Sequence, residues 1–242
     1  MKQQYSKHWA GWAKMIGVCT FAVGVLSACA PAAVVNKEKL GAVKTVAVVA
    51  AEAPVYRASS VNSTQMIAFT PADLIVAAVT NVAGAVGNAN REKNTASFNE
   101  LAVQKVGDTG ISRKVTDGVE EVFRRQAYNV VEITPEQFKA VQNGAAPEQK
   151  VDAYVHMTLG ENYFAASSLA AFMRIVRFQV QILGPDAKDV IYSSVHTKTP
   201  HDAPYYNTYA RMLDDLPNAI QGLDSALLTQ LPEFAASFKS AR

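Results

Sequence analysis

The sequence holds few of the groups that enzymes use for catalysis or that secreted domains use for cross-linking. Among its 242 residues there are only two cysteines, Cys19 and Cys29, and four histidines. It contains no G-x-S-x-G nucleophile elbow, no glycine-rich phosphate loop and no H-E-x-x-H zinc motif. These absences argue against the common hydrolase, nucleotide-binding and zinc-enzyme classes. We therefore predict no catalytic residue, no metal site and no cofactor.

Acidic residues are also missing from the N-terminal segment, where three lysines precede the apolar run at residues 15–26. This pattern predicts a secretory signal peptide. The run is about a dozen residues long, whereas a membrane-spanning helix needs about 20, and Pro31 would interrupt a longer helix. A permanent transmembrane anchor is the alternative, because the whole interval between Lys14 and Lys37 lacks charge.

The apolar run ends in Leu26-Ser27-Ala28-Cys29, which resembles the lipobox of bacterial lipoproteins at all four positions. The resemblance implies cleavage between Ala28 and Cys29, a diacylglycerol on the Cys29 thiol and a further acyl chain on the new amino group. Two or more acyl chains hold a protein firmly on a bilayer. The following residue is Ala30 and not the aspartate that favours inner-membrane retention, so the resemblance implies a lipid anchor in the outer membrane, facing the periplasm. The alternative is ordinary signal cleavage with an unrelated cysteine nearby.

Removal of residues 1–28 changes the charge balance of the chain. Three lysines leave with the segment, so 20 basic residues remain against 21 acidic ones. Because no excess of positive charge remains to neutralise phosphates, we expect no nucleic-acid binding. No second cysteine remains for a disulfide, so the core alone must hold the fold. We predict a signal peptide at 1–28, a lipidated flexible tether at 29–42 and a single periplasmic domain at 43–242.

Hydrophobic periodicity predicts an α/β or α+β domain. The valine-rich run at 43–50 indicates a buried central strand, and a second strand is expected at 128–133. An amphipathic helix is predicted from the helical spacing of Ile111, Val115, Val119, Val122 and Phe123. Thr134-Pro135-Glu136-Gln137 begins a short helix that reaches about Gln142. After Pro54 the chain turns polar, and there we expect a loop.

The second half of the chain predicts a sheet followed by a helix. Apolar and polar residues alternate over 151–159 and again over 176–182, so each strand buries one face and exposes the other, with Tyr154 and His156 on the wetter side. The turn at 184–186 leads into a third strand, which completes an antiparallel meander. A long helix follows from 209 to about 239, broken or kinked at its prolines. The prediction is a mixed sheet of about five strands, with helices covering it.

Two unusually apolar segments are candidate partner-binding surfaces. One is a helix expected at 71–88, which carries a single charge. The other is the connection at 164–172, where a hairpin tip would ordinarily be polar. Each apolar segment has three alternative explanations: packing against the protein's own core, docking onto a partner protein, or contact with a lipid surface. The residues we single out for partner binding are Val79, Val82, Val86, Phe164, Leu169 and Phe172.

The lipobox, the strand KTVAVVA, the run RRQAYNVVEI and the late meander together resemble small periplasmic lipoproteins of the curli-secretion and penicillin-binding-protein-activator type. Those proteins share a domain similar to the N-terminal domain of TolB. The resemblance implies a non-catalytic accessory lipoprotein in envelope assembly or export, which binds an envelope protein or itself. A ring-forming subunit of an export apparatus is the alternative.

A periplasmic hydrolase is the third possibility, and it would need His156, His196 and a carboxylate to converge in a pocket. His196, His201 and Asp202 are close enough in sequence for a metal site, but Pro200 separates them and the spacing fits no strong zinc template. A solvated strand end is the simpler interpretation of that segment.

Overall fold

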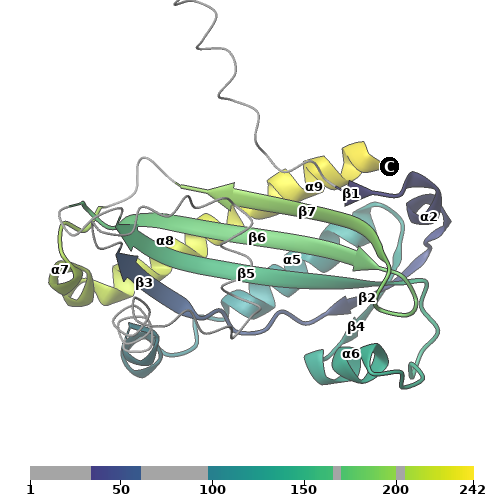
Figure 1. The fold of residues 1–242 in the computed structure, drawn as a ribbon, viewed down its shortest axis with the longest axis horizontal. Helices are drawn as coiled ribbons and strands as arrows, with labels where there is room; N and C mark the ends of the chain where they lie inside the picture. Colours follow the sequence, from purple (N-terminus) through teal and green to yellow (C-terminus); the bar gives the residue numbers. More distant parts are fainter. Residues whose placement is uncertain (1–33, 61–97, 166–169, 200–204) are drawn as a thin grey trace, which may run out of the picture. The chain divides into compact units, whose positions relative to one another are not determined.

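One mixed sheet organises the part of the chain that the structure, a computed structural model, describes: residues 34–60, 98–165, 170–199 and 205–242. Figure 1 shows this sheet as the body of the fold. The strands are β1 (Val34–Val35), β2 (Thr45–Val49), β3 (Tyr56–Ser60), β4 (Asn129–Ile133), β5 (Ala153–Ala165), β6 (Met173–Leu183) and β7 (Val190–Lys198). The helices are α2 (Lys37–Ala42), α5 (Ile111–Arg125), α6 (Pro135–Gln142), α7 (Tyr209–Asp214), α8 (Leu216–Leu228) and α9 (Gln230–Ala241), and residues 98–105 are helical as well. The predicted α/β class with a mixed sheet is confirmed.

The parallel half of the sheet is built around β2, which pairs in parallel with β4 on one side and with β5 on the other. Val46 and Val48 are fully buried on one face, while Ala47 and Val49 are buried on the opposite face. A strand covered on both faces has no polar positions to alternate with, which explains the unbroken valine run. The predicted central strand is therefore confirmed.

The antiparallel half is the predicted meander of β5, β6 and β7. The order across the sheet is β1-β7-β6-β5-β2-β4, and β3 pairs with the far end of β5 on the same edge as β2. The described sheet has seven strands, two more than expected. The prediction of a loop after Pro54 is wrong for Tyr56–Ser60. This segment is strand β3, and it buries Tyr56 and Ala58.

Helices cover the two faces of the sheet unequally. α5, α8 and α9 pack on one face, where Phe123, Phe234 and Phe238 are fully buried in contact with one another. α6 packs on the other face at one end of the sheet, through Phe138. Figure 1 shows α6 apart from the long helices. None of the helices in the described ranges is both long and apolar enough to cross a bilayer.

The prolines divide the C-terminal helical region as predicted. α7 ends before Asp215, and Pro217 lies in the first turn of α8. Thr229 separates α8 from α9, and Pro232 is the third residue of α9. Proline is tolerated in the first helical turn because the amide hydrogens there have no partner within the helix. Each break therefore lies just ahead of its proline.

The predicted tether at 29–42 is wrong over most of its length, because the folded domain begins by Val34. β1 pairs antiparallel with β7, and the backbone amide of Asn36 donates to the Ile191 carbonyl at 2.9 Å. The Asn36 side chain caps α2 by accepting from the Lys39 amide at 3.0 Å. Leu40 is 1% exposed within the main core. The mixed composition of this segment hid a short edge strand and a capped helical turn.

Candidate functional site

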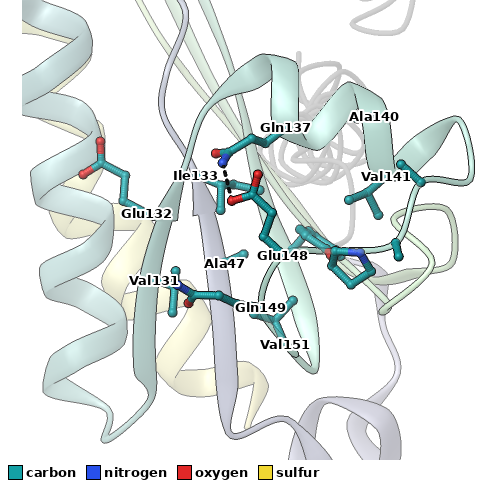
Figure 2. A pocket seen from close by; sticks show the side chains of 14 residues that line it. Ala47, Val131, Glu132, Ile133, Gln137, Ala140, Val141, Glu148, Gln149 and Val151 are labelled. Atoms are coloured by element: carbon teal, nitrogen blue, oxygen red, sulfur yellow. Dashed lines mark hydrogen bonds between the residues drawn. The ribbon is translucent and has the colours of Figure 1, made fainter.

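A pocket of about 250 Å³ lies between α6, strands β2 and β4, and the loop that precedes β5. Its wall is mostly apolar, and Figure 2 shows the side chains that surround it. The polar side chains among its lining are Glu132, Gln137, Glu148, Gln149 and Tyr154. The apolar lining consists of Ala47, Val131, Ile133, Ala140, Val141, Ala145, Ala146, Pro147 and Val151. An apolar cavity with a few polar groups is the usual form of a small-molecule site.

Gln137 joins the two sides of this pocket. The Gln137 side-chain oxygen accepts from the Thr134 backbone amide at 2.8 Å, and the Gln137 backbone amide donates to Thr134 Oγ1 at 3.3 Å. The predicted helix start is therefore a complete capping box. Its side-chain nitrogen donates to Glu148 Oε2 at 3.1 Å. Figure 2 shows this bond linking α6 to the loop before β5. One side chain therefore both caps the helix and holds the loop beside it.

Tyr154 is the buried polar residue of the pocket lining. Its side chain is 2% exposed, and the ring packs against Phe138 with centroids 5.8 Å apart. Its hydroxyl is buried and has no hydrogen-bond partner among the described residues. Burial raises the pKa of this phenol, so the hydroxyl keeps its proton at neutral pH and can donate it. The wetter side predicted for Tyr154 is wrong because α6 covers this end of the sheet.

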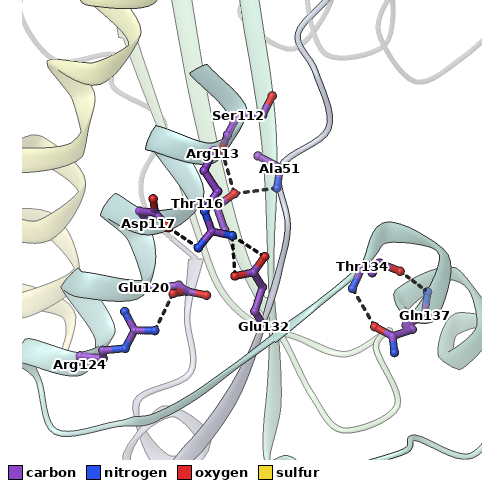
Figure 3. A network of polar contacts seen from close by, with 10 residues as sticks. All are labelled: Ala51, Ser112, Arg113, Thr116, Asp117, Glu120, Arg124, Glu132, Thr134 and Gln137. Atoms are coloured by element: carbon purple, nitrogen blue, oxygen red, sulfur yellow. Dashed lines mark hydrogen bonds and ion pairs between the residues drawn. The ribbon is translucent and has the colours of Figure 1, made fainter. Parts of the chain in front are cut away.

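The Glu132 carboxylate belongs to a polar network on the α5 side of β4. Arg113 holds it with one nitrogen 2.7 Å from each carboxylate oxygen, and Arg113 also contacts Asp117 at 2.5 Å. Figures 2 and 3 show Glu132 turned towards α5 and away from Glu148. Thr116 Oγ1 accepts from the Ala51 amide at 2.9 Å, which ties α5 to the end of β2. This network fixes the helix on the sheet and neutralises one of the two pocket carboxylates.

A second and wider hollow of about 740 Å³ runs between α5 and α9. Its apolar lining consists of Gly118, Val122, Leu231, Pro232 and Ala235, and its polar lining consists of Glu121, Arg125, Gln126, Lys239 and Arg242. Glu121 pairs with Arg125 at 2.7 Å, while Arg242 donates to the Gln126 carbonyl at 3.0 Å and lies over the Tyr128 ring. The groove is therefore apolar along its floor and has a net positive rim.

Two carboxyl groups are buried together at the other end of the sheet. Glu161 on β5 is 1% exposed and Asp224 on α8 is 8% exposed. The Tyr56 hydroxyl donates to Asp224 Oδ1 at 3.0 Å, whereas neither Glu161 oxygen has a hydrogen-bond partner among the described residues. Burial, and then the neighbouring Asp224 charge, raise the pKa of Glu161 to about 9. Glu161 is therefore protonated at neutral pH.

The histidines do not form the site that a hydrolase would need. His156 stacks on Phe138 with ring centroids 5.2 Å apart, on the α6 face. His196 lies on the opposite face, where its ring is 6.3 Å from that of Phe234 in α9. Burial lowers the pKa of both imidazoles. His201 and Asp202 lie outside the described residues, and no metal-binding group of three or more acidic, histidine or cysteine side chains occurs within them.

The predicted partner-binding residues are described only in part. Four of them lie outside the described residues: Val79, Val82, Val86 and Leu169. The predicted cleavage and lipidation residues, Ala28 and Cys29, lie outside them as well. Phe164 and Phe172 are half-buried at the two ends of the expected tip. The Phe172 amide donates to the Tyr206 carbonyl at 2.8 Å, and its ring lies 6.3 Å from that of Tyr209. This end of the connection therefore contacts the chain's own C-terminal part.

The sequence carried usable signals for some residues that we missed. Glu161 continues the alternation of Val155, Met157 and Leu159, so its inward direction follows from period two alone. The pocket had no comparable signal, because Tyr154 lies beside Ala47 only through the parallel pairing of β5 with β2, and α6 then packs over both.

Comparisons with known proteins do not assign the chain. No family model and no curated protein match it. Among solved structures, a homologue of the neuraminyllactose-binding hemagglutinin from Helicobacter pylori is 8% identical, with a TM-score of 0.34 over 83% of this chain and 91% of that one. The PelC dodecamer from Paraburkholderia phytofirmans is 12% identical, with a TM-score of 0.24 over 78% and 86% of the two chains. A protein from Xanthomonas campestris is 12% identical, with a TM-score of 0.26 over 83% and 90%. These values are too low to transfer a function.

Proposed function

We propose that the chain is an outer-membrane lipoprotein that acts as a non-catalytic accessory protein of the cell envelope. The observation that supports the proposal is the lipobox-like sequence Leu26-Ser27-Ala28-Cys29, which ends the apolar run at 15–26 and lies just ahead of the described fold. The first strand begins at Val34, so only residues 30–33 separate the acylated cysteine from the sheet. A fully extended chain spans at most about 3.6 Å per residue, so residues 30–33 allow only a short tether. An anchor at Cys29 therefore leaves little chain between the lipid and the described fold.

A binding role suits the described surface better than a catalytic one. The two described histidines lie on opposite faces of the sheet, and Glu132 is already held by Arg113. The groove between α5 and α9 has an apolar floor beside Lys239 and Arg242. This chemistry fits an amphipathic segment of an envelope protein that carries acidic side chains, because the basic rim attracts them while the floor takes up apolar ones.

The anchor is tested by Cys29→Ser, which removes the thiol that receives the diacylglycerol. We expect this variant to incorporate no labelled fatty acid and to move from the membrane fraction to the soluble periplasmic fraction. The control is Ser27→Ala, which keeps a small residue at that lipobox position and should stay in the membrane. A Cys29→Ser protein that still carries label and still sediments with membranes would contradict the proposed address.

The groove is tested in intact cells with a photoreactive residue in place of Ala235. We expect a crosslink to a segment of another envelope protein that contains acidic residues, and we expect Lys239→Glu to weaken it. The control position is Lys188, an exposed residue outside the groove. Crosslinking to a second copy of this chain, together with one large discrete assembly in mild detergent, would support the ring-forming subunit instead.

A further inference from the structure

We propose that the outer edge of β4 binds an extended segment of another protein, which joins the sheet as a further strand. The segment places one apolar side chain in the pocket beneath α6 and a basic side chain beside Glu148. This site is separate from the groove between α5 and α9. It therefore goes beyond the partner binding proposed above, and it does not depend on acylation of Cys29.

The backbone of β4 has hydrogen-bonding groups on its outer side that no described strand uses. β4 is the last strand on this side of the described sheet and pairs there with β2 alone. The Asn129 amide donates to the Lys44 carbonyl at 2.9 Å, so Asn129 faces the inner side. Because successive residues of a strand direct their backbone groups to opposite edges, Val130 and Glu132 direct theirs outwards. Such a row of amide and carbonyl groups is a template for another strand.

The outer edge of β4 is accessible. Each residue of β4 is at least partly exposed, whereas all but the first residue of β2 are buried. α5 and α6 pack on opposite faces of the sheet, and Figure 2 shows β4 between them. An incoming strand can therefore approach in the plane of the sheet, between the two helices.

The pocket beneath α6 adjoins this edge, because Val131, Glu132 and Ile133 of β4 all line it. It opens to the surface, since Ala140 and Glu148 in its wall are exposed. Side chains opposite one another on paired strands share a face, so the residue beside Val131 is directed towards α6. A cavity of about 150 Å³ holds benzene, and this pocket of about 250 Å³ admits a phenylalanine or leucine side chain. Backbone pairing with a pocket for one alternate side chain is the usual form of recognition by strand addition.

The charges around the pocket favour a basic segment. Glu148 accepts from the Gln137 side chain, but it forms no ion pair within the described residues. The other carboxylate of the lining, Glu132, is held by Arg113. A second copy of the chain would bring its own β4, which contains a glutamate and no basic residue. Charge complementarity therefore favours a different protein, with a lysine or arginine two residues from the apolar side chain and on the same face.

The test uses the fluorescein-labelled peptide Thr-Lys-Thr-Phe-Thr-Lys-Thr, in which the phenylalanine and both lysines share one face of a strand. Fluorescence polarisation measures its binding to the full chain in phosphatidylcholine nanodiscs, and empty nanodiscs give the background. Two further peptides carry backbone N-methyl groups, one on the phenylalanine and lysines and the other on the threonines that flank the phenylalanine. Because alternate amides face opposite edges of a strand, we expect only one of these peptides to bind more weakly, by at least about tenfold.

A proline substitution tests the edge from the side of the protein. Val130→Pro removes an outward amide and spares the pairing with β2, so it should weaken the unmethylated peptide at least about tenfold. The matched variant Val130→Ala keeps the amide and shortens the same side chain, and should bind within about threefold of the native chain. Thermal unfolding checks that both variants are folded, and the methylated peptides test the same edge in the native chain.

Two further variants test the pocket and the charge. Ala140→Leu narrows the pocket and should weaken the peptide at least about threefold, whereas Ala236→Leu, at an exposed position of α9 outside the pocket, should not. Glu148→Gln should weaken it about two- to fivefold, the range of an exposed ion pair.

Three results would overturn the proposal. The first is the absence of saturable binding below about 1 mM peptide. The second is equal binding of the two methylated peptides. The third is self-association of the native chain that Val130→Pro abolishes, which would assign this edge to a second copy.

Discussion

Replacing Glu161 with glutamine is expected to raise the thermal midpoint by about 5–15 °C at pH 8, and by little at pH 5. At pH 8 the expected gain in the free energy of unfolding is about 2–4 kcal/mol. The measurement is a series of thermal or urea unfolding curves of the native protein and the variant between pH 5 and pH 9. Glutamine fits because it keeps the shape of the side chain and removes the ionisable group.

The direction follows from the raised pKa of Glu161, which moves from 4.5 to about 9 on folding. Between these values the folded chain holds a proton that the unfolded chain has released. The stability of the native protein therefore falls as the pH rises through this window, with a limiting slope of about 1.4 kcal/mol per pH unit for one proton. Below about pH 4.5 the Glu161 carboxyl is protonated in both the folded and the unfolded chain, so it no longer lowers the stability of the native protein. Glutamine has no such proton, so its advantage grows with pH.

Three comparisons distinguish the pH dependence caused by Glu161 from that of other ionisable groups. Burial lowers the pKa values of His156 and His196, which removes stability below about pH 6.5 in the native protein and the variant alike. Glu121→Gln, at a half-exposed carboxylate, should change stability by less than about 0.5 kcal/mol at either pH. Asp224→Asn removes the neighbouring charge and should lower the pKa of Glu161. A Glu161→Gln protein whose advantage is the same at pH 5 and pH 8 would contradict the buried, protonated carboxyl.

Truncating Leu40 to alanine is expected to lower the free energy of unfolding by about 2–4 kcal/mol, although this residue lies in a segment whose composition predicts a tether. Leu40 is 1% exposed and packs in the main core, so its removal leaves a cavity beneath α2. A flexible tether would lose nothing measurable. Urea unfolding at fixed pH gives the difference directly.

The neighbouring residue provides the matched control. An added methyl group at Gly41 would meet no atom within 4 Å, and alanine favours the helical backbone of α2. Gly41→Ala should therefore leave stability unchanged or raise it by up to about 1 kcal/mol. Equal stability of Leu40→Ala and Gly41→Ala would contradict this account and indicate that residues 34–42 are a flexible tether.

The elements predicted well were those whose signal is local. The valine run that became β2, the helical spacing of α5 and the Thr134 capping box each depend on contacts within one segment. The meander followed from period-two alternation in β5 and β6. Such patterns are visible in the sequence because the spacing of apolar residues along one segment determines which side chains face the core.

The elements that we missed depend on distant partners. β1 is a strand only because β7 offers it an edge, and β3 because β5 is long enough to pair beyond the end of β2. Tyr154 became buried because Phe138 packs on it from a helix elsewhere in the chain. The candidate pocket needs β2 to pair with both β4 and β5 and α6 to pack over them, so no single window of sequence contains it.

The most direct test of the anchored-domain account is the intact mass of the native protein extracted from membranes. We predict a chain that begins at Cys29 and carries a diacylglycerol together with an amide-linked acyl group. A mass that starts at Met1, or at any residue other than an acylated Cys29, would contradict the account.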